Sequence, residues 1–173
     1  WLEATSLSSE QPYLPDIARL EWALLVGYGA ADAAVFDIAA LAAVPAAVQP
    51  NLRLHVWVGA ELVESPWPLV DIWQAHQLAA DERDNALADI DVRSPSTPCR
   101  ALVVRSAGRV LALALTASEA AFLRALQSRQ TLAEAIAAAL NEDPAFNPGA
   151  TLQAFIAQRT LTGFSTNETA QQV

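Results

Sequence analysis

Two alternating runs joined by a short turn constrain the fold of this chain more than any other feature. Residues 100–105 and 109–115 are rich in valine, leucine and alanine and begin or end with arginine, which is typical of β-strands. The Ser106-Ala107-Gly108 sequence between them suits a tight hairpin turn. We therefore predict an antiparallel β-hairpin over residues 100–115.

Three helices are predicted after this hairpin. The first begins at Thr116 or Ser118, the second at the capping box Thr131-Leu132-Ala133-Glu134, and the third covers residues 148–159. A hairpin followed by three short helices resembles a winged-helix arrangement. We therefore predict an α+β fold class, with a winged-helix-like β-hairpin plus three-helix C-terminal part over residues 99–165.

The N-terminal half is predicted to be mainly helical, with one strand segment. The Pro15-Asp16 pair suits the first turn of a helix, because proline lacks the amide that stays unbonded there and a carboxylate faces the positive helix end. Alternation over residues 51–64 indicates a strand. The acidic, then Ser- and Pro-rich stretch over residues 81–98 indicates a solvated loop or linker. The chain is therefore predicted to have two parts, residues 1–93 and 99–165.

Charge and composition exclude several classes of protein. The net charge is −9, and the ten cations are arginines scattered along the chain. Nonspecific nucleic-acid binding needs clustered cations that release counterions from phosphates, so the composition disfavours it. No apolar run approaches the roughly 20 residues that span a bilayer, so we predict no membrane partner. The single cysteine, Cys99, fits a reducing compartment, and we predict cytoplasmic localisation.

No motif in the chain predicts a catalytic or metal site. His55, His76 and Cys99 lack the close spacing of metal-binding motifs, and the acidic run over residues 81–91 lacks the EF-hand glycine. A nucleophile elbow and a phosphate-binding loop are absent from the sequence. We therefore predict that the chain is not an enzyme by itself and has no cofactor or metal of its own. A free-standing enzyme would need a metal or cofactor that copurifies with the chain.

Glu21 has an unusual place on the predicted first helix. At roughly 100° per residue, Arg19, Ala23 and Gly27 share one sector of the helix. Glu21 lies on the opposite side, among large apolar residues (Ile17, Leu24, Leu25 and Tyr28). A carboxylate in that position is either buried with an arginine or backbone donors, or placed at an interface. The residues alone leave both readings open.

Trp57 is predicted to be an exposed interface anchor. It alternates onto the face of the predicted strand opposite Leu54 and Val56, beside Arg53 and His55. An aromatic side chain on a polar strand face is suited to binding a partner.

The segment from Pro12 to Ala23, PYLPDIARLEWA, resembles the HvfC/BufC family, whose members are often labelled DNA-binding domain proteins. Similar blocks follow at residues 31–34, 52–55, 65–76 and 102–105. His55-Val56 stands where the family pattern has His-Pro. The larger members carry a helical N-terminal domain, to which that label refers, and the present sequence is similar to the short MbnC-type members that act in methanobactin biosynthesis.

This resemblance implies a non-catalytic partner subunit that forms a heterodimer with an iron-dependent oxidase of the MbnB/BufB type. That oxidase modifies cysteines of a ribosomally synthesised precursor peptide, and the iron would belong to it. The subunit is expected to bind the leader peptide and to stabilise the oxidase. We expect its partner-docking surface in residues 1–93, with these partner-binding residues: Arg19, Glu21, Trp22, Trp57 and Trp73.

The predicted hairpin and helices also resemble domains that bind leader peptides by strand addition. The strand over residues 109–115, with a groove against residues 148–159, is the predicted edge, and its arginines are expected to meet acidic leader residues. The predicted peptide-binding residues are Arg105, Arg109, Leu111, Leu113 and Phe155. The other reading is that this strand is fully paired inside the sheet. An alternative function is a DNA-binding or regulatory protein, which the scattered arginines disfavour.

Overall fold

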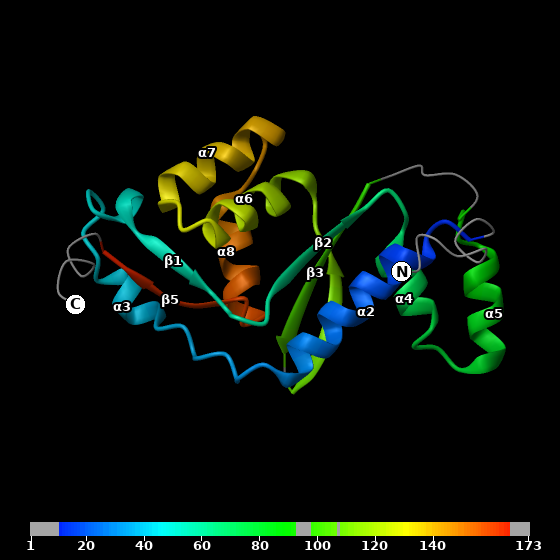
Figure 1. Cartoon of the computed structure of the whole chain (residues 1–173). Coiled ribbons are helices and arrows are strands. Elements are labelled where there is room, and N and C mark those ends of the chain that lie inside the picture. The colour runs from blue at the N-terminus through cyan, green and yellow to red at the C-terminus, as the bar shows by residue number, and fades with distance from the viewer. Residues whose placement is uncertain (1–10, 93–97, 107, 167–173) are drawn as a thin grey trace.

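The computed structural model describes residues 11–92, 98–106 and 108–166, in which helices surround two small antiparallel sheets (Figure 1). The α+β fold class is confirmed. The predicted hairpin is present as β3 (Cys99–Ser106) and β4 (Arg109–Ala114), with Gly108 in the turn at a φ of 76° that favours glycine. The strand β2 (Glu61–Ser65) pairs with the other side of β3, so the sheet order is β2-β3-β4.

The single strand predicted over residues 51–64 is wrong, because that segment contributes two strands to two different sheets. Its first half is β1 (Arg53–Val56), which pairs with β5 (Leu161–Ser165), and its second half is β2. The chain bends between them, where the Ala60 amide donates to the Trp57 carbonyl at 2.9 Å. A Cβ on Gly59 would lie 2.6 Å from the Trp57 ring, so the bend requires glycine.

The helices after the hairpin follow the predicted order. They are α6 (Ala117–Gln127), α7 (Leu132–Glu142) and α8 (Pro148–Ala157). The capping boxes at Thr116 and Thr131 are both formed, each with a glutamate three residues later. The two predicted parts share both sheets, since β1 and β2 come from residues 1–93 whereas β3, β4 and β5 come from residues 99–165.

The remaining elements precede the hairpin in the chain. They are α2 (Leu14–Gly29), α3 (Ile38–Ala42), the short 3-10 helix η2 (Gln49–Asn51), α4 (Leu69–Ala75) and α5 (Ala80–Ala88). The helix α5 corrects the predicted loop over residues 81–98, because Asp81 and Glu82 stabilise its first turn through the helix dipole. None of the helices in the described part of the chain is long and apolar enough to cross a membrane.

The core lies on both faces of the three-stranded sheet. On the central strand, Leu102 and Val104 belong to one cluster with Phe122 of α6 and Phe155 of α8. The alternate residues of the same strand, Ala101 and Val103, belong to a second cluster with α2 and α4. All four strand residues are fully buried, which fits a central strand covered on both sides.

The helix α2 packs on the second face of the sheet through one leucine and two small residues. Leu20, Ala23 and Gly27 are its buried positions. A Cβ on Gly27 would lie 3.3 Å from Val103 Cγ1 and 3.4 Å from Val110 Cγ1, so the glycine allows the close approach of helix and sheet. This choice of buried face determines which side chains α2 leaves in solvent.

Candidate docking surface

The outer face of α2 exposes four large apolar side chains. Trp22 is 67% exposed, Leu25 61%, Val26 50% and Tyr28 71%. Nearby, Val58 in the bend before β2 is 82% exposed. A helix that is apolar on nearly all sides is ordinarily covered, and a contiguous apolar surface marks an interaction site. The described fold therefore leaves uncovered a surface suited to docking; we call these five residues the docking face.

Glu21 does not have the environment expected for a buried carboxylate. It is exposed, and no hydrogen bond or ion pair joins it to another residue of the described part of the chain. The prediction that an arginine or backbone donors hold it is therefore wrong. The reason is that α2 buries Leu20, Ala23 and Gly27 against the sheet. The side with Glu21 is only partly covered, at Ile17 and Leu24, and leaves Leu25 and Tyr28 exposed. The interface reading of Glu21 stays a prediction.

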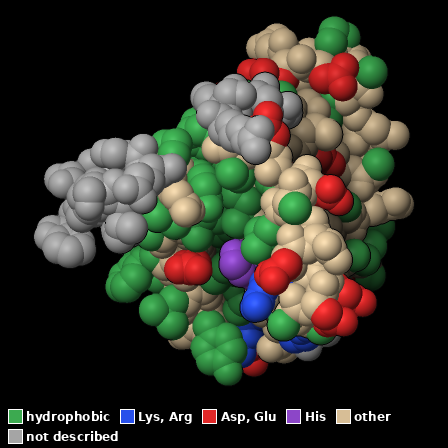
Figure 2. Space-filling view, turned by 90° about the vertical axis from the view of Figure 1, so that its right-hand side faces the viewer, with side chains coloured by type: hydrophobic (Ala, Val, Ile, Leu, Met, Phe, Trp, Pro, Cys, Tyr) green, Lys and Arg blue, Asp and Glu red, His purple; other side chains and the backbone are tan. Residues whose placement is uncertain are grey.

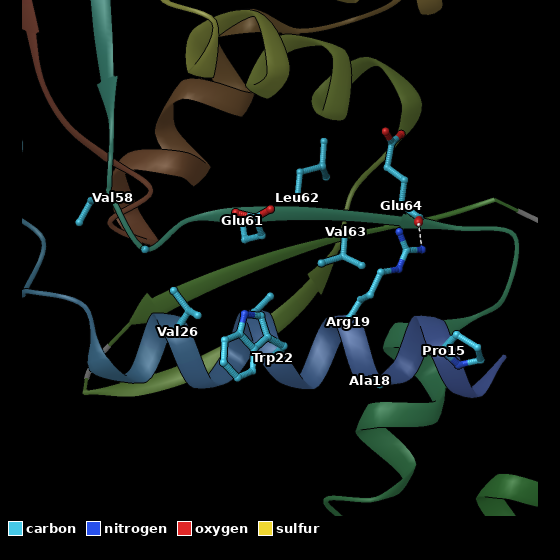
Figure 3. Close-up of a pocket in the computed structure, with 12 residues that line it drawn as sticks. Pro15, Ala18, Arg19, Trp22, Val26, Val58, Glu61, Leu62, Val63 and Glu64 are labelled. Atoms are coloured by element: carbon cyan, nitrogen blue, oxygen red, sulfur yellow. Dashed lines mark hydrogen bonds between the residues drawn. The ribbon is translucent and has the colours of Figure 1, made fainter. Parts of the chain in front are cut away.

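A groove of about 880 Å³ lies between α2 and β2, at the edge of the docking face. Its apolar and acidic walls come from both elements: Ala18, Trp22 and Val26 from α2, and Val58, Glu61 and Val63 from β2 and the preceding bend. Figure 3 shows α2 and β2 running alongside each other, with Val58 at one end of the groove and Arg19 near the other. An extended segment along β2 would therefore lie against Trp22 and Val26.

Polar contacts hold the far end of this groove together. Arg19 Nη2 donates to Asp16 Oδ1 at 2.7 Å and to the Glu64 carbonyl at 3.1 Å. The Ser65 hydroxyl donates to Asp16 Oδ2 at 2.5 Å. On the opposite face of β2, both Glu64 carboxylate oxygens accept from Arg124 Nη1 at 2.8 Å. These bonds join α2 and α6 to the end of β2, so Arg19 positions the groove as well as lining it.

The outer edge of β2 offers backbone hydrogen-bonding groups. The Glu64 carbonyl accepts a hydrogen bond from Arg19. The carbonyl of Arg100, which lies opposite Glu64 on β3, accepts from the Leu115 amide beside β4. The backbone N–H and C=O of Glu64 therefore point away from β3, toward the open edge of the sheet. Because these directions alternate along a strand, the backbone groups of Leu62, two residues earlier, point toward the same edge. In the sheet of the described residues β2 is an edge strand. Leu62 consequently presents one donor and one acceptor beside the groove.

Two of the predicted partner-binding tryptophans do not lie on the exposed surface. Trp57 is 3% exposed and its Nε1 donates to the Ala31 carbonyl at 2.7 Å, so the expected polar-face anchor is wrong. The strand ends at Val56, and the ring turns into the core at the bend. Trp73 is half-buried against the α2 side of the sheet. Of the predicted residues, Arg19 and Trp22 lie together on the groove.

The predicted peptide-binding residues are separated by the fold. Phe155 is 1% exposed in the core and cannot line an open groove, so this prediction is wrong. Arg105 bonds to the Ala30 carbonyl at 2.8 Å and to Asp32 at 3.0 Å, which fastens the segment after α2 to the sheet. Arg109 is exposed.

The strand β4 itself is half-buried at Leu111 and Leu113. It pairs with β3 alone among the described strands, so it is an edge strand as predicted. The α2–β2 groove, however, lies beside the other edge strand, β2, and not beside β4.

A second hollow of about 530 Å³ lies where α2 approaches α4 and α5. Its walls are mostly apolar, including Ile17, Ile72 and Leu87, and it also contains Glu21 and His76. Figure 2 faces the side that carries α4 and α5 in Figure 1, and it shows hydrophobic side chains gathered around a hollow with a histidine in it. Glu21 thus lines the second hollow, whereas its neighbour Trp22 lines the α2–β2 groove.

The other candidate chemical groups are dispersed. Among the described residues no three His, Cys, Asp or Glu side chains could hold a metal ion together. Burial lowers the pKa of His55, and the Arg129 guanidinium acts in the same direction. Burial raises the pKa of the Cys99 thiol, so the reactive thiolate is disfavoured at neutral pH. Neither group lines the α2–β2 groove.

Val26, Val58 and Glu61 were missed by the sequence reasoning. The spacing of Ala23 and Gly27, one helical turn apart, is the signal that could have found Val26, because it marks the side on which a helix approaches a sheet closely. The apolar residues outside that side are then left for another surface.

Comparison of the chain with models of known protein families, with curated proteins and with solved structures found no match. The HvfC/BufC resemblance therefore depends on the residues of the chain alone.

Proposed function

We propose that this chain is a non-catalytic accessory subunit that binds a protein partner through the docking face of α2. The supporting observation is that Trp22, Leu25 and Tyr28 are all more than half exposed on one helix. Tryptophan and tyrosine are enriched among the side chains that contribute most to binding, because they remove a large area from water with few rotatable bonds. The buried core of the described residues does not include these side chains, so partner binding accounts for them better than packing does.

The partner proposed from the sequence resemblance is an iron-dependent oxidase of the MbnB/BufB type. In this proposal the iron and the oxidation of precursor cysteines belong to the partner, and this chain stabilises the oxidase and presents the peptide. The cytoplasm is the proposed location.

The leader peptide is proposed to add as a strand to the outer edge of β2. The free groups of Leu62 would supply main-chain hydrogen bonds, and the groove beside Trp22 would receive alternate side chains. We propose β2 as the peptide-binding edge in place of β4, because two residues predicted to bind the peptide at β4 are not available. Phe155 is buried, and Arg105 is bonded to Asp32 of the same chain. A hairpin followed by three helices, as in winged-helix-like peptide-recognition domains, is compatible with this role.

The alternative, a DNA-binding or regulatory protein, has less support. Within the described part of the chain, carboxylates pair with these arginines: Arg19, Arg83, Arg100, Arg105 and Arg124. Paired cations on an acidic chain release few counterions from phosphates.

Coexpression with the candidate oxidase tests the proposal. The two chains should copurify, elute together in size exclusion, and separate when Trp22 and Tyr28 are both replaced by serine, with the circular dichroism spectrum of the variant unchanged. Separate elution of the two wild-type chains, with an oxidase that is stable and active alone, would contradict it. Salt-dependent duplex binding by the isolated chain would favour the alternative.

A further inference from the structure

We propose that the groove beside β2 selects an extended peptide segment that carries a lysine or arginine next to Glu61. This inference rests on the proposed function, since it concerns the peptide proposed to pair with β2. It adds a chemical preference and assigns that preference to one carboxylate of this chain.

The register of β2 places Glu61 where it can contact such a segment. Val63 packs against the α2 side of the sheet, and Glu61, two residues before it, lies on the same face of the strand. In an antiparallel addition, side chains directly opposite each other have Cβ atoms about 4.5–5.5 Å apart. A residue of the added strand opposite Glu61 would therefore have its side chain within reach of the carboxylate.

Glu61 is the charge of the groove that remains uncompensated. Arg19 is bonded to Asp16 at 2.7 Å, and Glu64 is bonded to Arg124 at 2.8 Å with Arg100 at 3.8 Å. Within the described part of the chain, Glu61 is exposed and has no ion pair or side-chain hydrogen bond. The groove thus combines paired charges with one free carboxylate, which attracts a cation and repels an anion.

Apolar neighbours of Glu61 also suit a long basic side chain. Trp22 and Val58 line the same groove and are largely exposed. The methylene stem of lysine or arginine packs on such surfaces while its charged end stays in water, and the cation is attracted to the face of an indole ring. A glutamate of the peptide in the position opposite Glu61 would instead place two carboxylates next to each other.

This preference is opposite to the one expected for a peptide on β4. There Arg105 and Arg109 were expected to meet acidic residues, but the Arg105 guanidinium is already bonded to Asp32 at 3.0 Å. The net charge of −9 acts in the same sense as Glu61, because it favours the approach of a basic segment over the whole surface.

Fluorescence anisotropy with labelled peptides tests the inference on the full chain. Three peptides of about nine residues, long enough to pair along β2, alternate valine with threonine and differ only in a central lysine, glutamine or glutamate. The lysine peptide should bind about fivefold more tightly than the glutamate peptide, since an exposed pair changes the affinity by a small factor and a like-charge pair acts in reverse. Added salt should reduce the difference.

Two substitutions at Glu61 and one control assign the effect. Glu61→Lys should reverse the order of the three peptides, and Glu61→Gln should make their affinities similar. Glu142→Gln, an identical change of charge on α7, should leave the order unchanged.

Several results would overturn the inference. Equal affinities of the three peptides for the wild-type chain, or an order that Glu61→Lys does not alter, would overturn the charge preference while leaving strand addition in place. Binding of none of the peptides would overturn strand addition at β2 together with the charge preference, while coexpression with the oxidase tests the docking face of α2 separately. Concentration-dependent dimerisation that Trp22→Ala abolishes, without peptide binding, would assign the edge to a second copy of the chain.

Discussion

Replacement of Trp22 by alanine separates partner binding from folding. A buried tryptophan removes about 200 Å² from water, so covering the exposed two thirds of this side chain would remove about 130 Å². At about 25 cal/mol per Å² that area corresponds to about 3 kcal/mol, of which alanine would retain a part. We therefore expect the dissociation constant for the oxidase to rise about thirtyfold, equivalent to about 2 kcal/mol. The free energy of unfolding should change by less than about 0.5 kcal/mol, as for other exposed positions.

Isothermal titration of the chain into the oxidase, with urea unfolding of the free chain, measures both quantities. The matched control is Leu140→Ala, which removes a partly exposed apolar side chain from α7 and should leave the dissociation constant unchanged. An unchanged affinity for Trp22→Ala would refute the reasoning. So would a large loss of stability, because Trp22 would then support the fold of the free chain.

The other predictions concern stability. Gly59→Ala should destabilise the chain by about 1–3 kcal/mol in urea, because the new methyl group would overlap the Trp57 ring, and an unchanged midpoint would contradict the bend. Thr131→Ala should cost about 1 kcal/mol by removing the helix cap. Hydrogen bonds from Thr131 lower the pKa of Glu134, so the part of the cap that the Glu134 carboxylate forms is present at neutral pH. That part should disappear in urea titrations as the pH falls below the usual carboxyl range. Burial lowers the pKa of His55, so stability should fall as the pH drops through about 6.5, and His55→Gln should reduce that slope.

Local signals predicted much of the C-terminal half. The capping boxes at Thr116 and Thr131 and the turn at Gly108 are encoded within a few residues each, so their structures follow from sequence spacing alone. Strand pairing required information that no local pattern contains. Arg53 pairs with Ser165, more than half the chain away, and nothing in the alternation over residues 51–64 indicates that its two halves join different sheets.

The site was predicted in part for a related reason. Trp22 lies on the docking face and Arg19 on the groove, but the helical spacing left open whether the side of α2 that carries Glu21 is buried or exposed. Contact with the sheet selected the small residues Ala23 and Gly27, because they allow a closer approach than leucine or tyrosine does. That outcome depends on the three-dimensional fit of helix and sheet.

Amide hydrogen exchange of the chain, free and saturated with the oxidase and the precursor peptide, tests the docking surface most directly. We predict slower exchange in the complex at the outward amide of Leu62 and in the second half of α2, where Trp22 and Tyr28 are exposed. The amides of α7 should exchange at the same rate in both states. Protection confined to α7 and α8, with Leu62 and α2 unchanged, would contradict the assignment of the docking face.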